Sequence, residues 1–205
     1  MNSALDALQR LKDGNSRFVA GQQSREINIS HARQTAASEA QQPHAIILGC
    51  SDSRVPAEII FDQGLGDLFV IRVAGNIVQT SQVGSVEFAA ARYGTRLVVV
   101  LGHSQCGAVL ATIEEIQRPT ENQSRHLRSI VDRVRPSVEG LLATGANEDV
   151  DLLLQRAIRA NVVGSMNHLR HGSEILDQLV QDEGLLIVGA EYSLETGSVE
   201  FFADA

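Results

Sequence analysis

Two short apolar runs, each followed by a side chain that can bind a metal, indicate what kind of sheet this 205-residue chain forms. Residues 45–49 read AIILG and precede Cys50, and residues 97–102 read LVVVLG and precede His103. Continuous apolar runs of this length are typical of parallel strands buried on both faces. The carboxyl ends of neighbouring parallel strands meet at one edge of the sheet, where open α/β sheets bind their ligands. We therefore expect Cys50 and His103 to lie close together.

A third candidate ligand, Cys106, lies three residues after His103, and Cys50 and Cys106 are the two cysteines of the chain. Two thiolates and one imidazole are three of the four ligands that tetrahedral Zn²⁺ prefers, and an open fourth position is typical of catalytic zinc. Taken singly, such residues are more often a buried apolar thiol and a hydrogen-bonded histidine. A closed structural zinc site is the competing metal role, and Asp52 is the nearby candidate for its fourth ligand. A disulfide is less favoured in a chain without a targeting segment.

Helical periodicity and further apolar runs complete the predicted fold. An amphipathic helix capped by Ser3 and ended by Gly21 is predicted from the spacing of Leu5, Leu8, Leu11 and Phe18. Other helices are predicted at residues 81–93, after Cys106, and at 124–143, 148–170 and 173–182, and strands at 69–72, 185–190 and 198–202. Pro136 should kink or divide the helix at 124–143, because proline removes a backbone donor.

The pattern therefore predicts one α/β domain over residues 1–205. Its central sheet is mostly parallel with an antiparallel edge strand and flanking helices. Residues 1–42 would form the amino-terminal helix and an extended polar arm. A net charge of −8 offers no basic face for phosphates, which argues against nucleic acid as a partner. No run approaches the about 18 apolar residues of a membrane span, so we expect no membrane partner and a soluble cytoplasmic enzyme.

Three segments are more specific than the fold pattern. Residues 50–56 read CSDSRVP, residues 69–76 read FVIRVAGN and residues 102–107 read GHSQCG. Together they resemble the β-class carbonic anhydrases, and the likeness extends from about Leu8 to Phe202. The resemblance implies Zn²⁺ bound by Cys50, His103 and Cys106, and reversible hydration of CO₂ to bicarbonate and a proton by zinc-bound hydroxide.

By the same resemblance, Asp52 and Arg54 form a pair that controls the fourth coordination position. Arg54 keeps Asp52 ionised by charge and hydrogen bonding. Asp52 then either accepts the proton of the hydroxide or binds zinc itself in a closed state. The alternative is an ordinary surface ion pair, which contributes about 0 to 1 kcal/mol.

The resemblance also implies a substrate pocket and an assembly. The pocket positions match Gln41, Phe69, Ala74 and Gly107, with Gln41 donating to substrate across the interface of a homodimer or homotetramer. From the residues alone, Gln41 is more simply a solvated loop amide and Phe69 a core residue. The amino-terminal helix is expected to pack on a partner subunit.

Another bacterial branch of the family has an inhibitory bicarbonate site made of a tryptophan, an arginine and a tyrosine. The matching positions here are Ile47, Arg72 and Tyr192, and the missing tryptophan favours the plant-like, constitutively open form. Two other functions remain open: hydrolysis of carbonyl sulfide or carbon disulfide on the same scaffold, and a non-catalytic zinc-binding module closed by Asp52. A redox protein is the weakest alternative, because the chain has no Cys-x-x-Cys motif.

Overall fold

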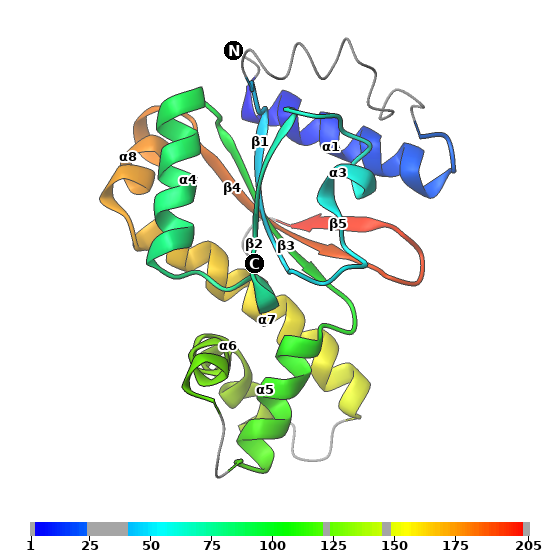
Figure 1. Cartoon of the computed structure of the whole chain (residues 1–205), viewed down its shortest axis with the longest axis vertical. Coiled ribbons are helices and arrows are strands. Elements are labelled where there is room, and N and C mark those ends of the chain that lie inside the picture. The colour runs from blue at the N-terminus through cyan, green and yellow to red at the C-terminus, as the bar shows by residue number, and fades with distance from the viewer. Residues whose placement is uncertain (1–2, 24–40, 121–123, 145–148, 203–205) are drawn as a thin grey trace.

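A five-stranded sheet is the centre of the computed structural model, which describes residues 3–23, 41–120, 124–144 and 149–202 (Figure 1). The strand order is β2-β1-β3-β4-β5. The five strands are β1 (Ala45–Gly49), β2 (Leu68–Arg72), β3 (Leu97–His103), β4 (Leu186–Tyr192) and β5 (Val199–Phe202). Neighbours pair in parallel except β4 and β5, which are antiparallel. The predicted mostly parallel sheet with an antiparallel edge strand is confirmed.

Helices cover both faces of this sheet because β1 and β3 alternate their apolar side chains between two cores. One face packs against α1 (Ala4–Val19) and α3 (Ala57–Ile60). The other packs against α4 (Thr80–Tyr93), α7 (Val150–His171) and α8 (Glu174–Asp182). Beyond the carboxyl ends of the strands lie α5 (Gly107–Gln117) and α6 (Arg125–Thr144), which pack with the first half of α7 (Figure 1).

Gly102 allows the close approach of α7 to β3 just before the predicted ligand His103. A Cβ atom at Gly102 would lie 2.6 Å from Cγ2 of Val162, nearer than real side chains come. The long helix α7 is therefore packed directly beneath the end of β3, and it can brace the loops that follow the strands.

The amino-terminal helix begins and ends close to where the sequence predicts, and one side of it packs on its own chain. Ser3 caps it and Gly21 follows with a φ of 65°. Ala4, Ala7 and Leu11 face the sheet, whereas Leu5 is 69% exposed. The small side chains of Ala4 and Ala7 allow α1 to pack closely on its own chain, and Leu5 lies outside this contact. The predicted extended arm at residues 22–42 lies largely outside the described residues.

Pro136 does not divide the helix in which it lies. The helix α6 is continuous from Arg125 to Thr144, and Pro136 is exposed. On either side of it, Val134 and Val138 are fully buried in one apolar cluster. Burial of these side chains offsets the one backbone hydrogen bond that proline removes, so the helix is not divided, and a kink at Pro136 stays a prediction. No helix among the described ranges is long and apolar enough to cross a bilayer.

His44 introduces a dependence of stability on pH. It precedes β1, and both of its ring nitrogens are buried without a hydrogen-bond partner. Burial, assisted by the nearby Arg10 guanidinium, lowers the pKa of His44 to about 4. Since the folded pKa lies below the unfolded value of about 6.5, the neutral ring contributes stability that is complete above that pH. This contribution is lost as the pH falls toward 4.

We expect His44→Leu to make the folded protein less sensitive to acid. Allowing for partial exposure of the ring, the free energy of unfolding of the wild type should fall by about 1 to 3 kcal/mol more than that of the variant between pH 7 and 4. Urea unfolding at several pH values measures this difference. His171→Leu, at an exposed position at the end of α7, is the matched control and should behave as the wild type. Parallel pH curves for wild type and His44→Leu would refute the role of the ring.

Candidate metal centre

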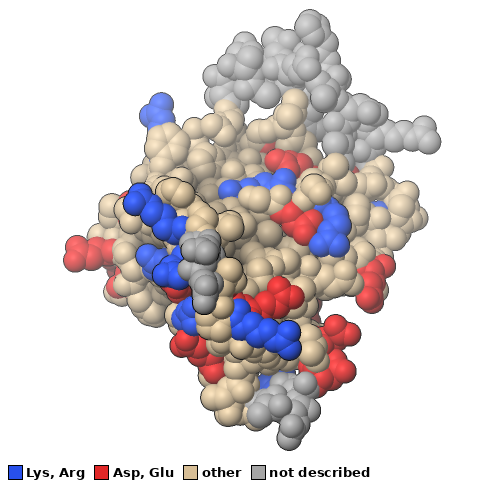
Figure 2. Space-filling model, turned by 60° about the horizontal axis from the view of Figure 1, so that its bottom comes forward, with Lys and Arg blue, Asp and Glu red and all other residues tan. Residues whose placement is uncertain are grey.

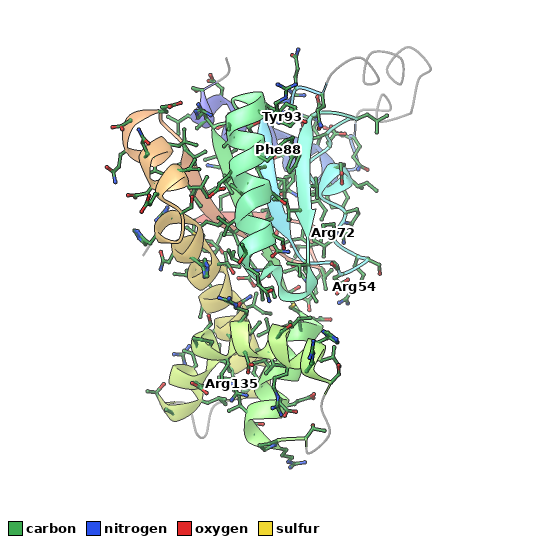
Figure 3. The ribbon with its side chains drawn as sticks, turned by 60° about the vertical axis from the view of Figure 1, so that its left-hand side comes forward. Arg54, Arg72, Phe88, Tyr93 and Arg135 are labelled. Carbon is green, nitrogen blue, oxygen red and sulfur yellow. The ribbon has the colours of Figure 1, made fainter. Side chains whose placement is uncertain are left out.

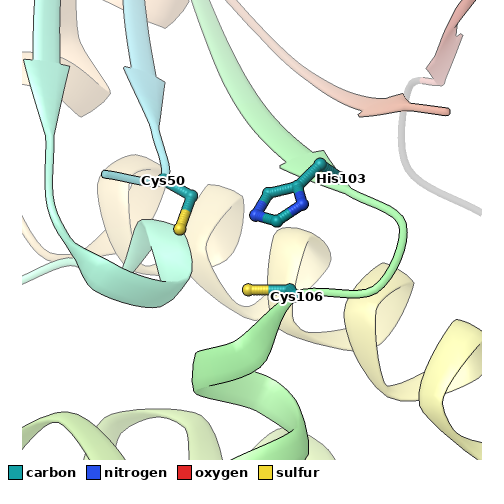
Figure 4. A group of neighbouring side chains, drawn as sticks. All are labelled: Cys50, His103 and Cys106. Carbon is teal, nitrogen blue, oxygen red and sulfur yellow. The ribbon is translucent and has the colours of Figure 1, made fainter. Parts of the chain in front are cut away.

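The three predicted metal ligands converge at the carboxyl ends of β1 and β3 (Figure 4). Cys50 directly follows β1, His103 is the last residue of β3, and Cys106 is the N-cap of α5. Their ligand atoms lie within 4.8 Å of one another, and all three residues are buried. Tetrahedral zinc places its sulfur and nitrogen ligands roughly 3.5 Å apart. The donor set and its spacing therefore fit zinc.

The ring of His103 is held in the orientation that a ligand needs. Its Nδ1 lies 2.9 Å from the carbonyl oxygen of Ser104, which can only accept, so Nδ1 carries the proton. Ser104 is itself fixed, because its amide donates to Tyr192 O at 2.9 Å and its hydroxyl accepts from the Leu194 amide at 2.9 Å. The lone pair on Nε2 is thereby available, and this buried nitrogen has no hydrogen-bond partner. An unpartnered buried ligand atom is what a metal site requires.

The two cysteine thiols affect one another's ionisation. A hydrogen bond from Cys106 lowers the pKa of Cys50 to about 4, and the Gly75 amide, 3.4 Å from the sulfur, acts in the same direction. The same hydrogen bond, together with burial, raises the pKa of Cys106. A divalent cation between the sulfurs would displace that proton, because thiolates are the metal-binding form.

Asp52 lies beside the cluster and is held by Arg54 on both carboxylate oxygens. Arg54 Nε donates to Oδ1 at 2.9 Å and Nη2 donates to Oδ2 at 2.8 Å, while the Arg54 amide also donates to Oδ1 at 3.0 Å. This bidentate pair holds the pKa of Asp52 well below its usual range. Asp52 Oδ2 lies 3.9 Å from His103 Nε2. An ionised acceptor thus stands next to the ligand atoms.

Arg72 fixes the loop that carries Cys50 and Asp52. Its Nε donates to Cys50 O at 3.0 Å and its Nη2 donates to Asp52 O at 2.5 Å. Sequence reasoning assigned Arg72 only to an inhibitory site and missed this positional role. The signal that could have revealed it is the position of Arg72 at the end of β2, opposite Gly49 on the neighbouring strand.

Comparisons with known proteins decide the family. A family model described as carbonic anhydrase matches residues 45–199. Carbonic anhydrase 2 of Mycobacterium tuberculosis is 41% identical over 192 residues, which cover 93% of this chain and 89% of the relative. The solved β-carbonic anhydrase CafA of Aspergillus fumigatus is similar with a TM-score of 0.76 at 25% identity, covering 85% of this chain and 84% of that one. The chain belongs to the β-class carbonic anhydrase family.

More distant members share the same fold. Two tetrameric β-carbonic anhydrases of Sordaria macrospora are represented by a structure with a TM-score of 0.75 at 21% identity, which covers 85% of this chain and 90% of its own. At this identity the likeness concerns the arrangement of helices and strands. It agrees with the predicted fold class.

The expected substrate residues of this β-carbonic anhydrase fall into two groups. Ala74 precedes Gly75, whose amide contacts the Cys50 sulfur, and Gly107 follows Cys106. Gly107 is therefore the chain neighbour of a ligand, and Ala74 is the chain neighbour of a residue that contacts one. Gln41 and Phe69 are not near the ligands, because Gln41 precedes β1 whereas Cys50 follows it, and Phe69 pairs with Ile46 near the start of β1.

Gln41 and Phe69 instead join an aromatic group on α4 at the β2 edge of the sheet. The Gln41 amide donates to the Tyr93 hydroxyl at 2.7 Å, and the Phe69 ring lies 6.3 Å from Phe88 and 6.1 Å from Tyr93, between centroids. In Figure 3, Phe88 and Tyr93 lie at the opposite end of the sheet from Arg54 and Arg72. Within one chain this group cannot line the metal site.

The surface over the carboxyl ends of the strands is mixed in charge. Figure 2 brings this face forward and shows acidic and basic side chains interspersed on it.

The positions matching the inhibitory site of the other branch, Ile47 and Tyr192, are buried with the sheet core.

Proposed function

We propose that this β-carbonic anhydrase catalyses the reversible hydration of CO₂ to bicarbonate and a proton, with zinc bound by Cys50, His103 and Cys106. The observation that carries the proposal is the ionised Asp52 carboxylate, held by Arg54 with Oδ2 3.9 Å from His103 Nε2. When bound, zinc supplies Lewis acidity that makes a nearby water a nucleophile. The engagement of both Asp52 oxygens by Arg54 favours a site whose fourth position is open to water over one closed by Asp52.

The side chains around this position have distinct tasks. An ionised carboxylate can only accept, so Asp52 orients the reacting water by taking a hydrogen bond from it and leaves an oxygen lone pair directed at the substrate carbon. Arg54 holds that acceptor in place through two parallel hydrogen bonds. Cys50 and Cys106 belong to a buried apolar cluster that includes Ile77 and Val109. Apolar walls suit neutral CO₂ and strengthen nearby electrostatic interactions.

Measurement of CO₂ hydration together with metal analysis on the same purified sample tests this function. We expect about one zinc per chain and turnover that is lost when a chelator removes the metal. Parallel assays with carbonyl sulfide and carbon disulfide test the alternative hydrolases. Zinc without CO₂ turnover, or faster turnover of either sulfur compound, would contradict the proposal.

We further propose that the enzyme acts as a homodimer or homotetramer in which the group of Gln41, Phe69, Phe88 and Tyr93 faces a partner's metal centre. Two observations support this arrangement. The group lies at the β2 edge, where the described sheet ends, and Phe88 is 53% exposed. On α1, Leu5 and Val19 are 69% and 50% exposed, although the other side of this helix packs on its own chain. These two apolar side chains are therefore available to contact a partner subunit.

Phe88→Glu is therefore expected to weaken assembly and lower activity together, because a charge in an apolar interface loses its hydration. Sedimentation velocity across a dilution series measures the dissociation, and CO₂ hydration is followed on the same samples. Ile175→Glu, which changes a 52% exposed position on α8, is the matched control and should leave both unchanged. A fully active monomer would refute the shared site.

A further inference from the structure

The short turn behind Cys50 is held in place from α7. This turn, Ala74–Asn76, carries the Gly75 amide that donates to the Cys50 sulfur at 3.4 Å. On its other side, the Gly75 carbonyl accepts from Asn161 Nδ2 at 2.8 Å. Ser165, one turn further along α7, donates its hydroxyl to Asn76 O at 3.0 Å. Asn161 and Ser165 are 2% and 5% exposed, so their side chains are largely shielded from bulk water.

The backbone of this turn needs such support. Gly75 and Asn76 both have positive φ, 71° and 42°, a conformation that is uncommon outside glycine. A Cβ at Gly75 would lie 3.2 Å from Ala108 Cβ and 3.4 Å from Val134 Cγ2, so α5 and α6 press closely on it. Packing against α5 and α6 restricts movement of the turn on one side. On the other side, hydrogen bonds from Asn161 and Ser165 of α7 hold it in place.

We propose that Asn161 is a positioning residue of the metal centre, which fixes the backbone of Gly75 at its carbonyl and thereby directs the Gly75 N–H group at the Cys50 sulfur. This inference rests on the zinc site proposed above. A hydrogen bond to a thiolate draws charge from the sulfur and fixes its direction, so losing it changes both the bond to the metal and the retention of the metal. Groups that orient metal ligands in this way typically change metal affinity about 10- to 100-fold when removed.

The protein should tolerate loss of the Asn161 amide. Asn161 and Ser165 border a cavity of about 210 Å³ between α6 and α7. This space is polar enough, with Ser137 and His168 on its wall, to admit a water that satisfies the Gly75 carbonyl. Asn161→Ala then folds but no longer fixes the turn. Asn161→Asp is a second variant of nearly the same volume, in which the side chain loses its donor.

The chain offers a matched control in Asn15. It is also a buried asparagine whose Nδ2 donates to backbone carbonyls, of Ile60 at 3.2 Å and Gly197 at 2.9 Å, but it lies on α1, against the opposite face of the sheet from α7. Asn15→Ala should therefore reduce thermal stability without affecting the metal. This separates a general structural loss from the specific effect that we propose.

The test compares wild type, Asn161→Ala, Asn161→Asp and Asn15→Ala in two measurements that need no turnover. The equilibrium constant for zinc transfer to a chelator should be about 10- to 100-fold larger for both Asn161 variants than for the wild type. The thiolate-to-metal absorption band of the cobalt-substituted protein should shift in these two variants and not in Asn15→Ala.

Two results would overturn the inference: unchanged zinc transfer and absorption band in both Asn161 variants, or an equal change in Asn15→Ala. A wild type that binds zinc without hydrating CO₂ would refute the proposed function alone. The Asn161 effect on the metal would still be measurable in that protein.

Discussion

Cys50→Ser and His103→Ala are each expected to lose bound zinc and CO₂ hydration together. Either change leaves two of the three ligands that converge in the structure, which is too few to hold a catalytic zinc. A serine hydroxyl is also a poor substitute for a thiolate, because it is not ionised near neutral pH. We expect the zinc content to fall from about one per chain to near zero and the rate to fall at least about 1000-fold.

Controls separate loss of the metal from loss of the fold. His171→Ala removes an exposed histidine at the end of α7, and Ser51→Ala changes the exposed neighbour of Cys50. Both should keep zinc and activity. Far-ultraviolet circular dichroism establishes that the two ligand variants retain their helices. Full zinc content in both Cys50→Ser and His103→Ala would mean that the ligand assignment is wrong.

The sequence predicted the sheet and the meeting of its metal ligands for a physical reason. Strands buried on both faces must be apolar throughout, so β1 and β3 are recognisable as continuous runs. Parallel neighbours end at the same edge, which brings Cys50 and His103 together without further information. The helix predicted at 81–93 ends at Tyr93, where Gly94 follows with a φ of 66°.

Other features depend on contacts that leave no local pattern. Leu5 matches the helical period of α1, but the small side chains of Ala4 and Ala7 allow a closer approach to the sheet and set the buried face. The bonds from Arg72 and Asn161 join residues distant in the chain through single hydrogen bonds, and neither position has a periodicity that reveals them. Gln41 and Phe69 lie far from the metal ligands of their own chain, so a role at the site requires a second subunit.

Asp52→Asn is expected to keep zinc and lose most turnover. The amide has nearly the same shape as the carboxylate, but it is neutral and its NH₂ group donates, so it cannot serve as a charged acceptor beside the ligand cluster. The three metal ligands are untouched. We expect the rate of CO₂ hydration to fall about 100- to 1000-fold, with one zinc per chain retained. Assays of rate and metal content on the same samples measure both quantities.

Arg54→Ala acts on the same group by a different route. Without the guanidinium the pKa of Asp52 rises toward its ordinary value of about 3.9, so the carboxylate stays ionised at neutral pH. The expected loss of rate therefore comes from a change in the position of the carboxylate. Without Arg54 the Asp52 side chain can move away from the ligand cluster or bind the metal. Arg54→Lys restores the charge but not the two parallel bonds, and should recover only part of the rate.

The double variant Asp52→Asn/Arg54→Ala distinguishes this pair from an ordinary surface ion pair. If Arg54 acts only through Asp52, the double variant should be no slower than Asp52→Asn, because residues that act as one unit have non-additive effects. Arg135→Ala is the control, since Arg135, which Figure 3 labels on α6, forms a partly exposed ion pair with Glu139 at 3.4 Å. That change should leave the rate unaltered. Wild-type rates in both single variants would make the Asp52 and Arg54 pair merely structural. A loss of rate in the double variant equal to the product of the two single losses would show that Arg54 has a separate role in the reaction.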